Sequence, residues 1–140
     1  MVEHEADLIP EGFLLESGTD PAEDHIGPFY LRRDPEHFSA GLMPGARHGN
    51  GMGNVHGGVL LTFADFALCA QARYGTQDDH IVTVSLNVDF ISAAKTGQWL
   101  HSEGAVTRRT GSLVFLQGSI RQGAQTVVTY SGVGKRWQNN

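Results

Sequence analysis

Two glycines and one aspartate stand where they could act on a carbonyl compound. Gly57 and Gly58 follow a loop rich in Gly and Asn and precede an apolar run, residues 59–72, in which Asp65 is the only charged residue. The run contains no Pro and is dominated by Leu, Ala and Phe, so it predicts a helix of about four or five turns. The first amides of a helix have no intrahelical acceptor, and beside glycine they can approach and polarise a ligand oxygen. Alternatively, the glycines serve only a tight turn, and Asp65 is hydrogen-bonded to Thr62 or exposed through a gap in the packing.

The separation of the two groups limits how they can cooperate. Gly57 and Asp65 lie about 12 Å apart along a helix axis and about 80° apart around it. A reacting carbonyl needs its oxygen within roughly 3 Å of the amide, and its carbon or a water within roughly 3 to 3.5 Å of the carboxylate. One copy of the chain does not readily satisfy both. If the groups cooperate, they come from two copies, which predicts a symmetric dimer with two shared sites.

Three further polar residues near these groups are candidates for the same chemistry. His56 could be a general base, although a histidine at a helix start more often orients the loop or caps the first turn. Asn50 is typical of a turn, and its amide could also hold a water or a ligand. Thr83 falls on the polar side of an alternating strand, so its hydroxyl is expected to face solvent.

The segment 108–112 is a candidate anion site, because two guanidinium groups stand there beside a tight turn and a hydroxyl. Arginines at a hairpin are usually solvated, so a phosphate contact is the alternative interpretation. The charge distribution favours it somewhat: residues 1–31 carry eight acids and no Lys or Arg, whereas residues 90–140 carry six bases and one acid. The candidate residues are Arg108, Arg109, Gly111 and Ser112.

Composition excludes several classes of protein. With 140 residues the chain fits one domain with a core. Cys69 is the only cysteine, which excludes an internal disulfide and a multi-Cys metal site and suits a reducing compartment; we expect it in the core. The seven histidines lack metal-ligand spacing, and the bases form no dense patch, so neither a metal site nor nucleic-acid binding is expected. No secretory signal or membrane-spanning run is present, so we expect a cytoplasmic protein.

The remaining pattern predicts strands around the helix. In residues 81–91 apolar and polar residues alternate, so the apolar side (Val82, Val84, Leu86, Val88 and Phe90) is expected to pack on the helix. Short Gly-containing links favour antiparallel hairpins. The predicted fold is α+β, with a long helix in the curve of an antiparallel sheet of about five or six strands. Residues 1–24 are predicted to be an acidic arm and residues 25–137 a single domain, with strands at 26–33, 37–43, 81–91, 99–107, 113–121 and 126–133.

Taken together, these motifs resemble a known family. Asn50, the His56-Gly57-Gly58 motif, Asp65 nine positions after His56, and the stretch VTVSLNVDFISAAKTG resemble the hotdog-fold acyl-CoA thioesterases of the PaaI-like (phenylacetate-pathway) group. The resemblance runs through about residues 36–136 and leaves out the arm. The chain departs from the pattern at Ala93, where the family commonly has Pro.

The resemblance implies hydrolysis of an acyl-CoA or aryl-acyl-CoA thioester to a carboxylic acid and free CoA, with no metal or redox cofactor. It implies that the sheets of two subunits pair side by side and that such homodimers often pair again into homotetramers. The amide of Gly57 would polarise the carbonyl, and Asp65 of the other subunit would act as nucleophile or as base towards water. By the same resemblance, Asn50 would hold the reacting groups and His56 would support the loop. Thr83 would place water, and Arg108 and Arg109 would contact the CoA phosphates.

Two alternatives remain open at this point. Hotdog proteins include hydratases and dehydratases, and others bind acyl-CoA without turning it over, so the fold does not settle the function. The sequence does not identify the acyl group either, since the pocket would be shared between subunits. Phe63, Phe66 and Phe90 are candidates for its lining.

Overall fold

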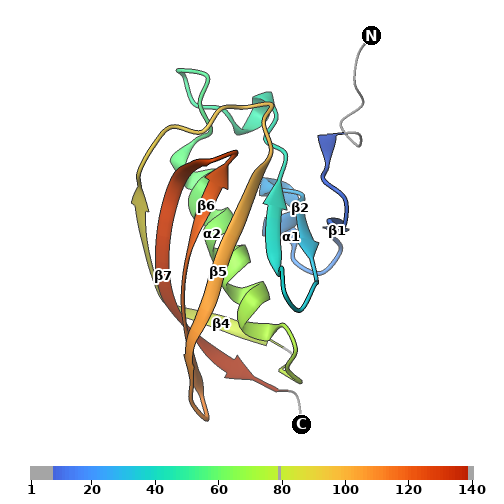
Figure 1. Ribbon diagram of the computed structural model, residues 1–140, viewed down its shortest axis with the longest axis vertical. Coiled ribbons are helices and arrows are strands. Elements are labelled where there is room, and N and C mark those ends of the chain that lie inside the picture. Colours follow the sequence, from blue (N-terminus) through green and yellow to red (C-terminus); the bar gives the residue numbers. More distant parts are fainter. Residues whose placement is uncertain (1–7, 79, 139–140) are drawn as a thin grey trace.

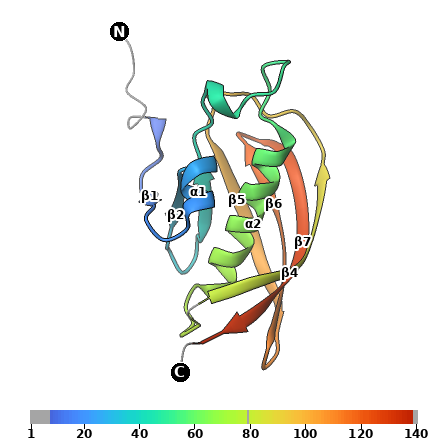
Figure 2. The ribbon, with the colours of Figure 1, turned by 180° about the vertical axis from the view of Figure 1, so that it is seen from behind.

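The computed structural model describes residues 8–78 and 80–138. A seven-stranded antiparallel sheet curves around one long helix, α2 (Gly57–Arg73), as Figures 1 and 2 show. The strand order is β1-β2-β3-β5-β6-β7-β4, so β1 and β4 form the two edges. The strands are β1 (Leu14–Glu16), β2 (Phe29–Arg32), β3 (Ser39–Leu42), β4 (His80–Phe90), β5 (Leu100–Arg109), β6 (Leu113–Gln122) and β7 (Gln125–Trp137). The predicted central helix and antiparallel sheet are confirmed.

The apolar residues of α2 form the core with the sheet. Phe63 and Leu68 of α2 are fully buried, together with Leu100 of β5 and Ile120 of β6. Phe29 of β2 packs against α2, and its ring stacks on the rings of Phe63 and Phe66, with centroids 5.4 and 4.8 Å apart. Phe63 and Phe66 are therefore core residues, and neither offers a surface to a ligand, contrary to the expectation that they line the acyl pocket.

The acidic arm contains more structure than predicted. The helix α1 (Pro21–Ile26) begins where Asp20 accepts a hydrogen bond from the Glu23 amide at 3.0 Å, with Pro21 in the first helical position. This cap signal ends the predicted strand 26–33 early, because Ile26 belongs to α1 and only the four residues of β2 are extended. Within the arm β1 also adds a seventh strand to the sheet. The helix α1 packs against α2, as Figure 2 shows, and thereby brings an acidic segment to the central helix.

The predicted alternation of β4 is wrong in its first half. The register between β4 and β7 shifts between Thr83 and Ser85. One extra residue in a strand inverts which side chains face the core. Val82 and Val84 are consequently 54% and 60% exposed, and Thr83 faces α2 instead of solvent. Leu86 and Val88, beyond the bulge, pack against the core as predicted. Phe90, predicted on the same side, lies at the end of β4 and is exposed instead.

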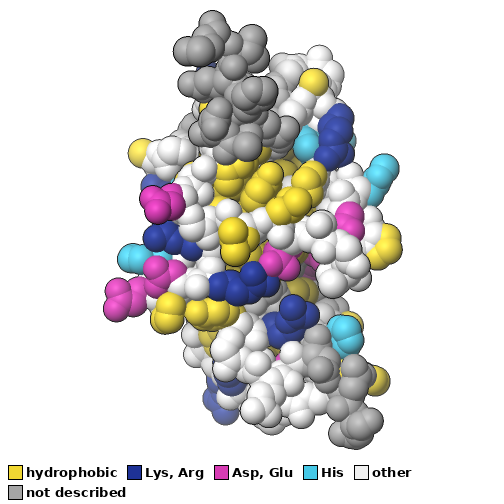
Figure 3. All heavy atoms as spheres, turned by 90° about the vertical axis from the view of Figure 1, so that its right-hand side faces the viewer, with side chains coloured by type: hydrophobic (Ala, Val, Ile, Leu, Met, Phe, Trp, Pro, Cys, Tyr) yellow, Lys and Arg dark blue, Asp and Glu magenta, His cyan; other side chains and the backbone are white. Residues whose placement is uncertain are grey.

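The two edges of the sheet differ in character. The edge at β4 carries exposed apolar side chains, among them Val82 and Val84. The edge at β1 also exposes Leu14 and Leu15, but it has only three residues and lies beside the ion pair between Arg33 and Glu16, whose charged atoms are 2.7 Å apart. Figure 3 looks on the side that carries β1 and shows basic and acidic side chains standing among apolar ones. Short, charged edges resist pairing with another chain, whereas β4 is open to it.

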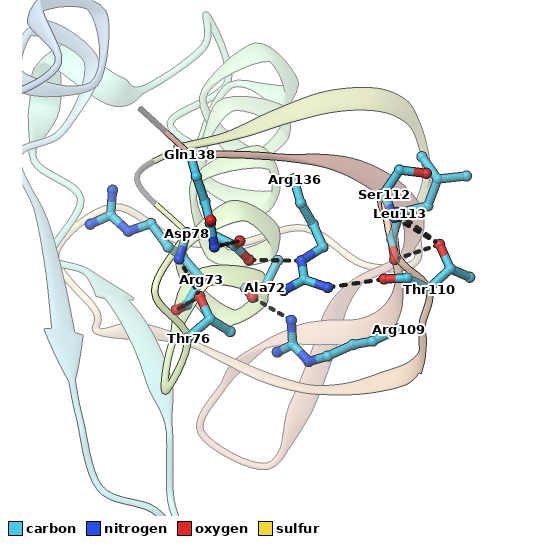
Figure 4. A network of polar contacts seen from close by, with 10 residues as sticks. All are labelled: Ala72, Arg73, Thr76, Asp78, Arg109, Thr110, Ser112, Leu113, Arg136 and Gln138. Carbon is cyan, nitrogen blue, oxygen red and sulfur yellow. Dashed lines mark hydrogen bonds and ion pairs between the residues drawn. The ribbon is translucent and has the colours of Figure 1, made fainter. Parts of the chain in front are cut away.

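A polar network fastens the far end of α2 to the sheet (Figure 4). Asp78, in the link after α2, accepts from Arg136 Nε at 3.0 Å, and Gln138 Nε2 donates to its other oxygen at 3.3 Å. Arg136 Nη1 donates to the carbonyl of Thr110 in the β5–β6 turn at 2.9 Å, and Arg109 Nη1 donates to the carbonyl of Ala72 at 2.8 Å. The end of the helix, the β5–β6 turn and the end of β7 are thus held together by arginines.

Candidate active site

The first turn of α2 leaves one amide available to a ligand. His56 is the N-cap, and its Nδ1 accepts from the Gly58 amide at 2.8 Å, while the carbonyl of His56 accepts from Val59 and Leu60 at 3.0 and 3.2 Å. The Gly57 amide has no acceptor among the described residues, and Gly57 is half-buried. An unpaired helical amide that is still reachable can donate a hydrogen bond to a carbonyl or anionic oxygen.

The capping bond also decides how His56 can act. A ring nitrogen that accepts a hydrogen bond is the unprotonated one, so the neutral ring carries its proton on Nε2. The nitrogen that could serve as a base is therefore occupied by the Gly58 amide. His56 has the capping role that a histidine in this position usually has.

Asn50 and His48 shape the loop that leads into α2. Asn50 Oδ1 accepts from the amides of Met52 and Asn54 at 2.8 and 3.1 Å, so Asn50 is the expected turn residue. His48 is buried; its Nδ1 accepts from the Gly45 amide at 2.9 Å, and its Nε2 lies 2.7 Å from the carbonyl of Ile26. It thereby joins the loop to the end of α1. Nothing in the sequence distinguishes His48 from the other scattered histidines.

Phe90 lies beside the available amide. A Cβ atom placed on Gly57 would stand 3.5 Å from the Phe90 ring, so the ring borders the space in front of that residue. Phe90 is 55% exposed, unlike the core residues Phe63 and Phe66. Of the three phenylalanines that are candidates for the lining of the acyl pocket, Phe90 is the one that a ligand at Gly57 can touch.

Asp65 is held by Thr83 across the gap between helix and sheet. The Thr83 hydroxyl donates to Asp65 Oδ1 at 2.5 Å, because the β4 bulge turns it inward. Asp65 is half-buried, and its Oδ2 has no hydrogen-bond donor among the described residues. The alternative partner, Thr62, donates instead to the Gly58 carbonyl at 2.9 Å. The carboxylate is thus fixed by one oxygen and available through the other.

Cys69 completes this cluster on the next turn of α2. Its Sγ lies 3.2 Å from Thr83 Oγ1. Burial raises the pKa of the Cys69 thiol to about 12, and the charges of Asp65 and Glu23 add to the rise. Cys69 is therefore a protonated thiol at neutral pH and not a nucleophile. As expected, it packs against the core.

Glu23 of α1 brings a second carboxyl group close to Asp65. Burial raises the pKa of Glu23 to about 7, with further contributions from Asp20, Asp65 and Asp24. A carboxylate disfavours ionisation of another nearby, so the charge of Asp65 opposes ionisation of Glu23. In the sequence Glu23 is one of eight acids of the arm, and the Asp-Pro helix cap before it is the only signal that could have marked it.

The segment 108–112 lies at the other end of α2 from Gly57. Both arginines are exposed; Arg109 donates to the helix end, and Arg108 follows a bulge in β5. Gly111 and Ser112 belong to a turn in which Thr110 Oγ1 accepts from the amides of Ser112 and Leu113 at 3.3 and 2.9 Å. A CoA phosphate contact by this segment remains a prediction.

Comparisons with known proteins give the family of this chain. The family model described as "Thioesterase superfamily" matches residues 52–129. This chain belongs to the thioesterase superfamily. A Pseudomonas aeruginosa protein named "Putative esterase PA0474" is 32% identical over 127 residues, which cover 89% of this chain and 95% of that protein. Together they support a thioester hydrolase.

Solved structures give the fold. The Escherichia coli PaaI protein of the phenylacetic acid degradation operon superposes with a TM-score of 0.75 at 19% identity, over 87% of this chain and 88% of that one. A Bacillus halodurans protein solved with CoA gives 0.70 at 19% identity, over 79% and 74%. The hotdog fold that the motifs suggested is confirmed.

Two further observations concern the surroundings of the site. No helix among the described residues is long and apolar enough to cross a membrane. Within residues 8–78 and 80–138 no group of three or more His, Cys, Asp or Glu side chains could hold a metal ion.

Proposed function

We propose that this thioesterase hydrolyses an acyl-CoA or aryl-acyl-CoA thioester to a carboxylic acid and free CoA, at two sites shared between the subunits of a homodimer. One observation carries the proposal. The Gly57 amide is the one left without an acceptor in the first turn of α2, and the same helix holds a carboxylate with one open oxygen, Asp65 Oδ2. CoA in the structure of the Bacillus halodurans protein supports the substrate class.

In this mechanism the thioester carbonyl accepts a hydrogen bond from Gly57 of one subunit. Charge that develops on the carbonyl oxygen is stabilised by this amide and by the helix start behind it. Asp65 Oδ2 of the other subunit attacks the carbonyl carbon, or takes a proton from a water that attacks it. If Asp65 attacks, the C–S bond breaks to leave a mixed anhydride on Asp65, which water then hydrolyses to the carboxylic acid and the free Asp65 carboxylate. If water attacks, breaking of the C–S bond gives the carboxylic acid directly. In both cases the water supplies the proton with which CoA leaves as its thiol.

The helix geometry and the β4 edge support the proposed dimer. Gly57 and Asp65 lie about 12 Å apart along one helix, too far to act on one carbonyl. The exposed apolar side chains of β4 provide an edge on which a second copy can continue the sheet. We further propose that such dimers pair into a homotetramer, that Asn50 holds the reacting groups, and that the CoA phosphates are bound near Arg108, Arg109, Gly111 and Ser112.

A panel of CoA thioesters, scored for release of free thiol, tests the reaction. The wild-type chain is expected to release thiol from some acyl or aryl-acyl members. Loss or gain of enoyl absorbance without thiol would indicate a hydratase instead, and saturable binding without turnover would indicate a binding protein. Either result overturns the proposal.

Replacing Gly57 tests the amide directly. Gly57 is the first residue of α2, where proline is tolerated, and His56 has the extended backbone that suits a residue before proline. Gly57→Pro removes the N–H, whereas Gly57→Ala keeps it and serves as the control. We expect Gly57→Pro to lower kcat by about a hundredfold or more and Gly57→Ala to lower it much less.

Mixing two inactive variants tests the sharing of sites. A dimer of one Gly57→Pro subunit and one Asp65→Asn subunit contains one intact site and one doubly altered site. An equal mixture after subunit exchange should recover about a quarter of the wild-type activity, because half of the dimers are hybrids with one good site. No recovery after demonstrated exchange would rule out shared sites and leave the thioesterase activity itself untouched.

A further inference from the structure

The Thr83 hydroxyl lies between two groups that have different hydrogen-bonding abilities. Its oxygen is 2.5 Å from Asp65 Oδ1 and 3.2 Å from Cys69 Sγ. Asp65 and Cys69 are four residues apart on α2, so they share one face of the helix, and Thr83 meets both from β4. A hydroxyl has one proton to donate and two lone pairs with which to accept.

The direction of both bonds follows from this count. An ionised carboxylate has no proton, so the Thr83 proton is donated to Asp65. Thr83 then has only lone pairs to offer Cys69, and the thiol must be the donor of the second bond. With a pKa raised to about 12 by burial, the thiol keeps its proton throughout the neutral range.

We propose that Cys69 is a positioning residue for the thioesterase reaction: its S–H donates to Thr83 Oγ1, commits the Thr83 proton to Asp65 Oδ1 and leaves Asp65 Oδ2 as the reacting oxygen. The inference rests on the proposed function, since it requires an ionised Asp65. Cys69 does not touch the substrate in this role. It acts through Thr83, which without it can turn its proton away from the carboxylate.

Two substitutions at Cys69 separate positioning from packing. Cys69→Ala removes the donor, and Cys69→Ser keeps a donor of similar size. We expect Cys69→Ala to lower kcat about three- to tenfold with little change in KM, in line with the loss of one hydrogen bond. Cys69→Ser should restore most of the loss. Wild-type kcat in Cys69→Ala, or equal losses in both variants, would overturn the proposal.

The contact can also be read without measuring activity. Cys69 is the only cysteine in the chain, so the S–H stretching band in the infrared spectrum belongs to it alone. Thr83→Val removes the acceptor, and the band should shift to higher frequency than in the wild type. An unchanged band would overturn the proposal even if Cys69→Ala proved unstable. If the wild type releases no thiol from any thioester, the proposed function fails, whereas the spectrum still tests the bond.

Discussion

Asp65 and Asp78 both have carboxylates that are shielded from solvent near α2, but they differ in the hydrogen-bond donors and charges that surround them. Asp78 has a side chain only 1% exposed, and it receives the Arg136 guanidinium and the Gln138 amide. Asp65 is half-buried and receives one hydroxyl, on one oxygen. A carboxylate that has donors on both oxygens and a cation beside it contributes to structure. A carboxylate with a donor on only one oxygen has its second oxygen available to react.

The pKa of Asp78 agrees with its structural role. Burial alone would raise it, but the hydrogen bond and charge of Arg136, helped by Gln138 and Thr76, outweigh burial and bring the pKa below its usual value. The ionised form is thus the one that the fold stabilises. The Arg109 bond to the end of α2 lies in the same region, so the helix is anchored at this end and open to ligands at its start.

The largest expected effect is on kcat, and it comes from replacing the Asp65 carboxylate by an amide. Asp65→Asn should lower kcat for thioester hydrolysis by about a hundredfold or more, because the amide can neither attack nor accept the proton. The melting temperature should change little, since Asn can still accept from Thr83. Steady-state thiol release and a thermal melt measure the two effects. Near-native turnover in a folded Asp65→Asn protein would remove Asp65 from the mechanism.

Asp78→Asn should show the opposite pattern. It leaves the Arg136 charge without its partner in a partly buried position, which we expect to lower the free energy of unfolding by about 2 kcal/mol. That loss corresponds to a fall in melting temperature of roughly 6 to 8 °C. At a temperature where the variant is folded, kcat should stay within about twofold of the wild type. A large loss of kcat with unchanged stability would erase the contrast between the two aspartates.

The comparison also shows what local sequence can and cannot predict. The central helix, the Gly57 amide and Asp65 could be predicted because composition and spacing along one segment encode them. Asp78 and Arg136 are 58 positions apart, so their pairing depends on the sheet that brings β7 to the end of α2. The two adjacent arginines of the segment 108–112 predict an anion site, but no local pattern indicates that Arg109 holds a helix end.

Thr83 illustrates a second limit. Strict alternation placed its hydroxyl towards solvent, whereas the bulge between Thr83 and Ser85 turns it towards Asp65. A bulge is decided by the pairing of two strands, β4 and β7, and is not visible in either strand alone. The family resemblance names Thr83 as a site residue, which stays a prediction; the structure shows that its hydroxyl contacts Asp65, where the pattern of the strand had turned it to solvent.

Low pH should lower the free energy of unfolding of the wild type, because it protonates Asp78. Because its pKa is lowered on folding, Asp78 contributes stability that is present above its unfolded pKa, about 4, and is lost as the pH falls through the lower folded value. Urea unfolding of the wild type and of Asp78→Asn between pH 7 and pH 3 measures this contribution. The difference between the two proteins should shrink below about pH 4. A difference that stays constant down to pH 3 would mean that the charge of Asp78 is not what stabilises the network.

Glu23 lies between the two extremes, and the smallest effect is expected there. Its pKa is raised from 4.5 to about 7 in the folded protein, so folding takes up a proton between these values and the free energy of unfolding falls as the pH rises through that range. Glu23→Gln removes the cost of ionising a half-buried carboxyl group. At pH 8 the free energy of unfolding of the variant should therefore exceed that of the wild type, by less than about 1 kcal/mol because solvent screens a half-buried group. This difference in stability should disappear by about pH 5. Glu11→Gln, which removes an exposed acid from the same segment, is the matched control. If both variants gain equally at pH 8, the effect comes from the net charge of the arm, and not from the burial of Glu23 or the acids beside it.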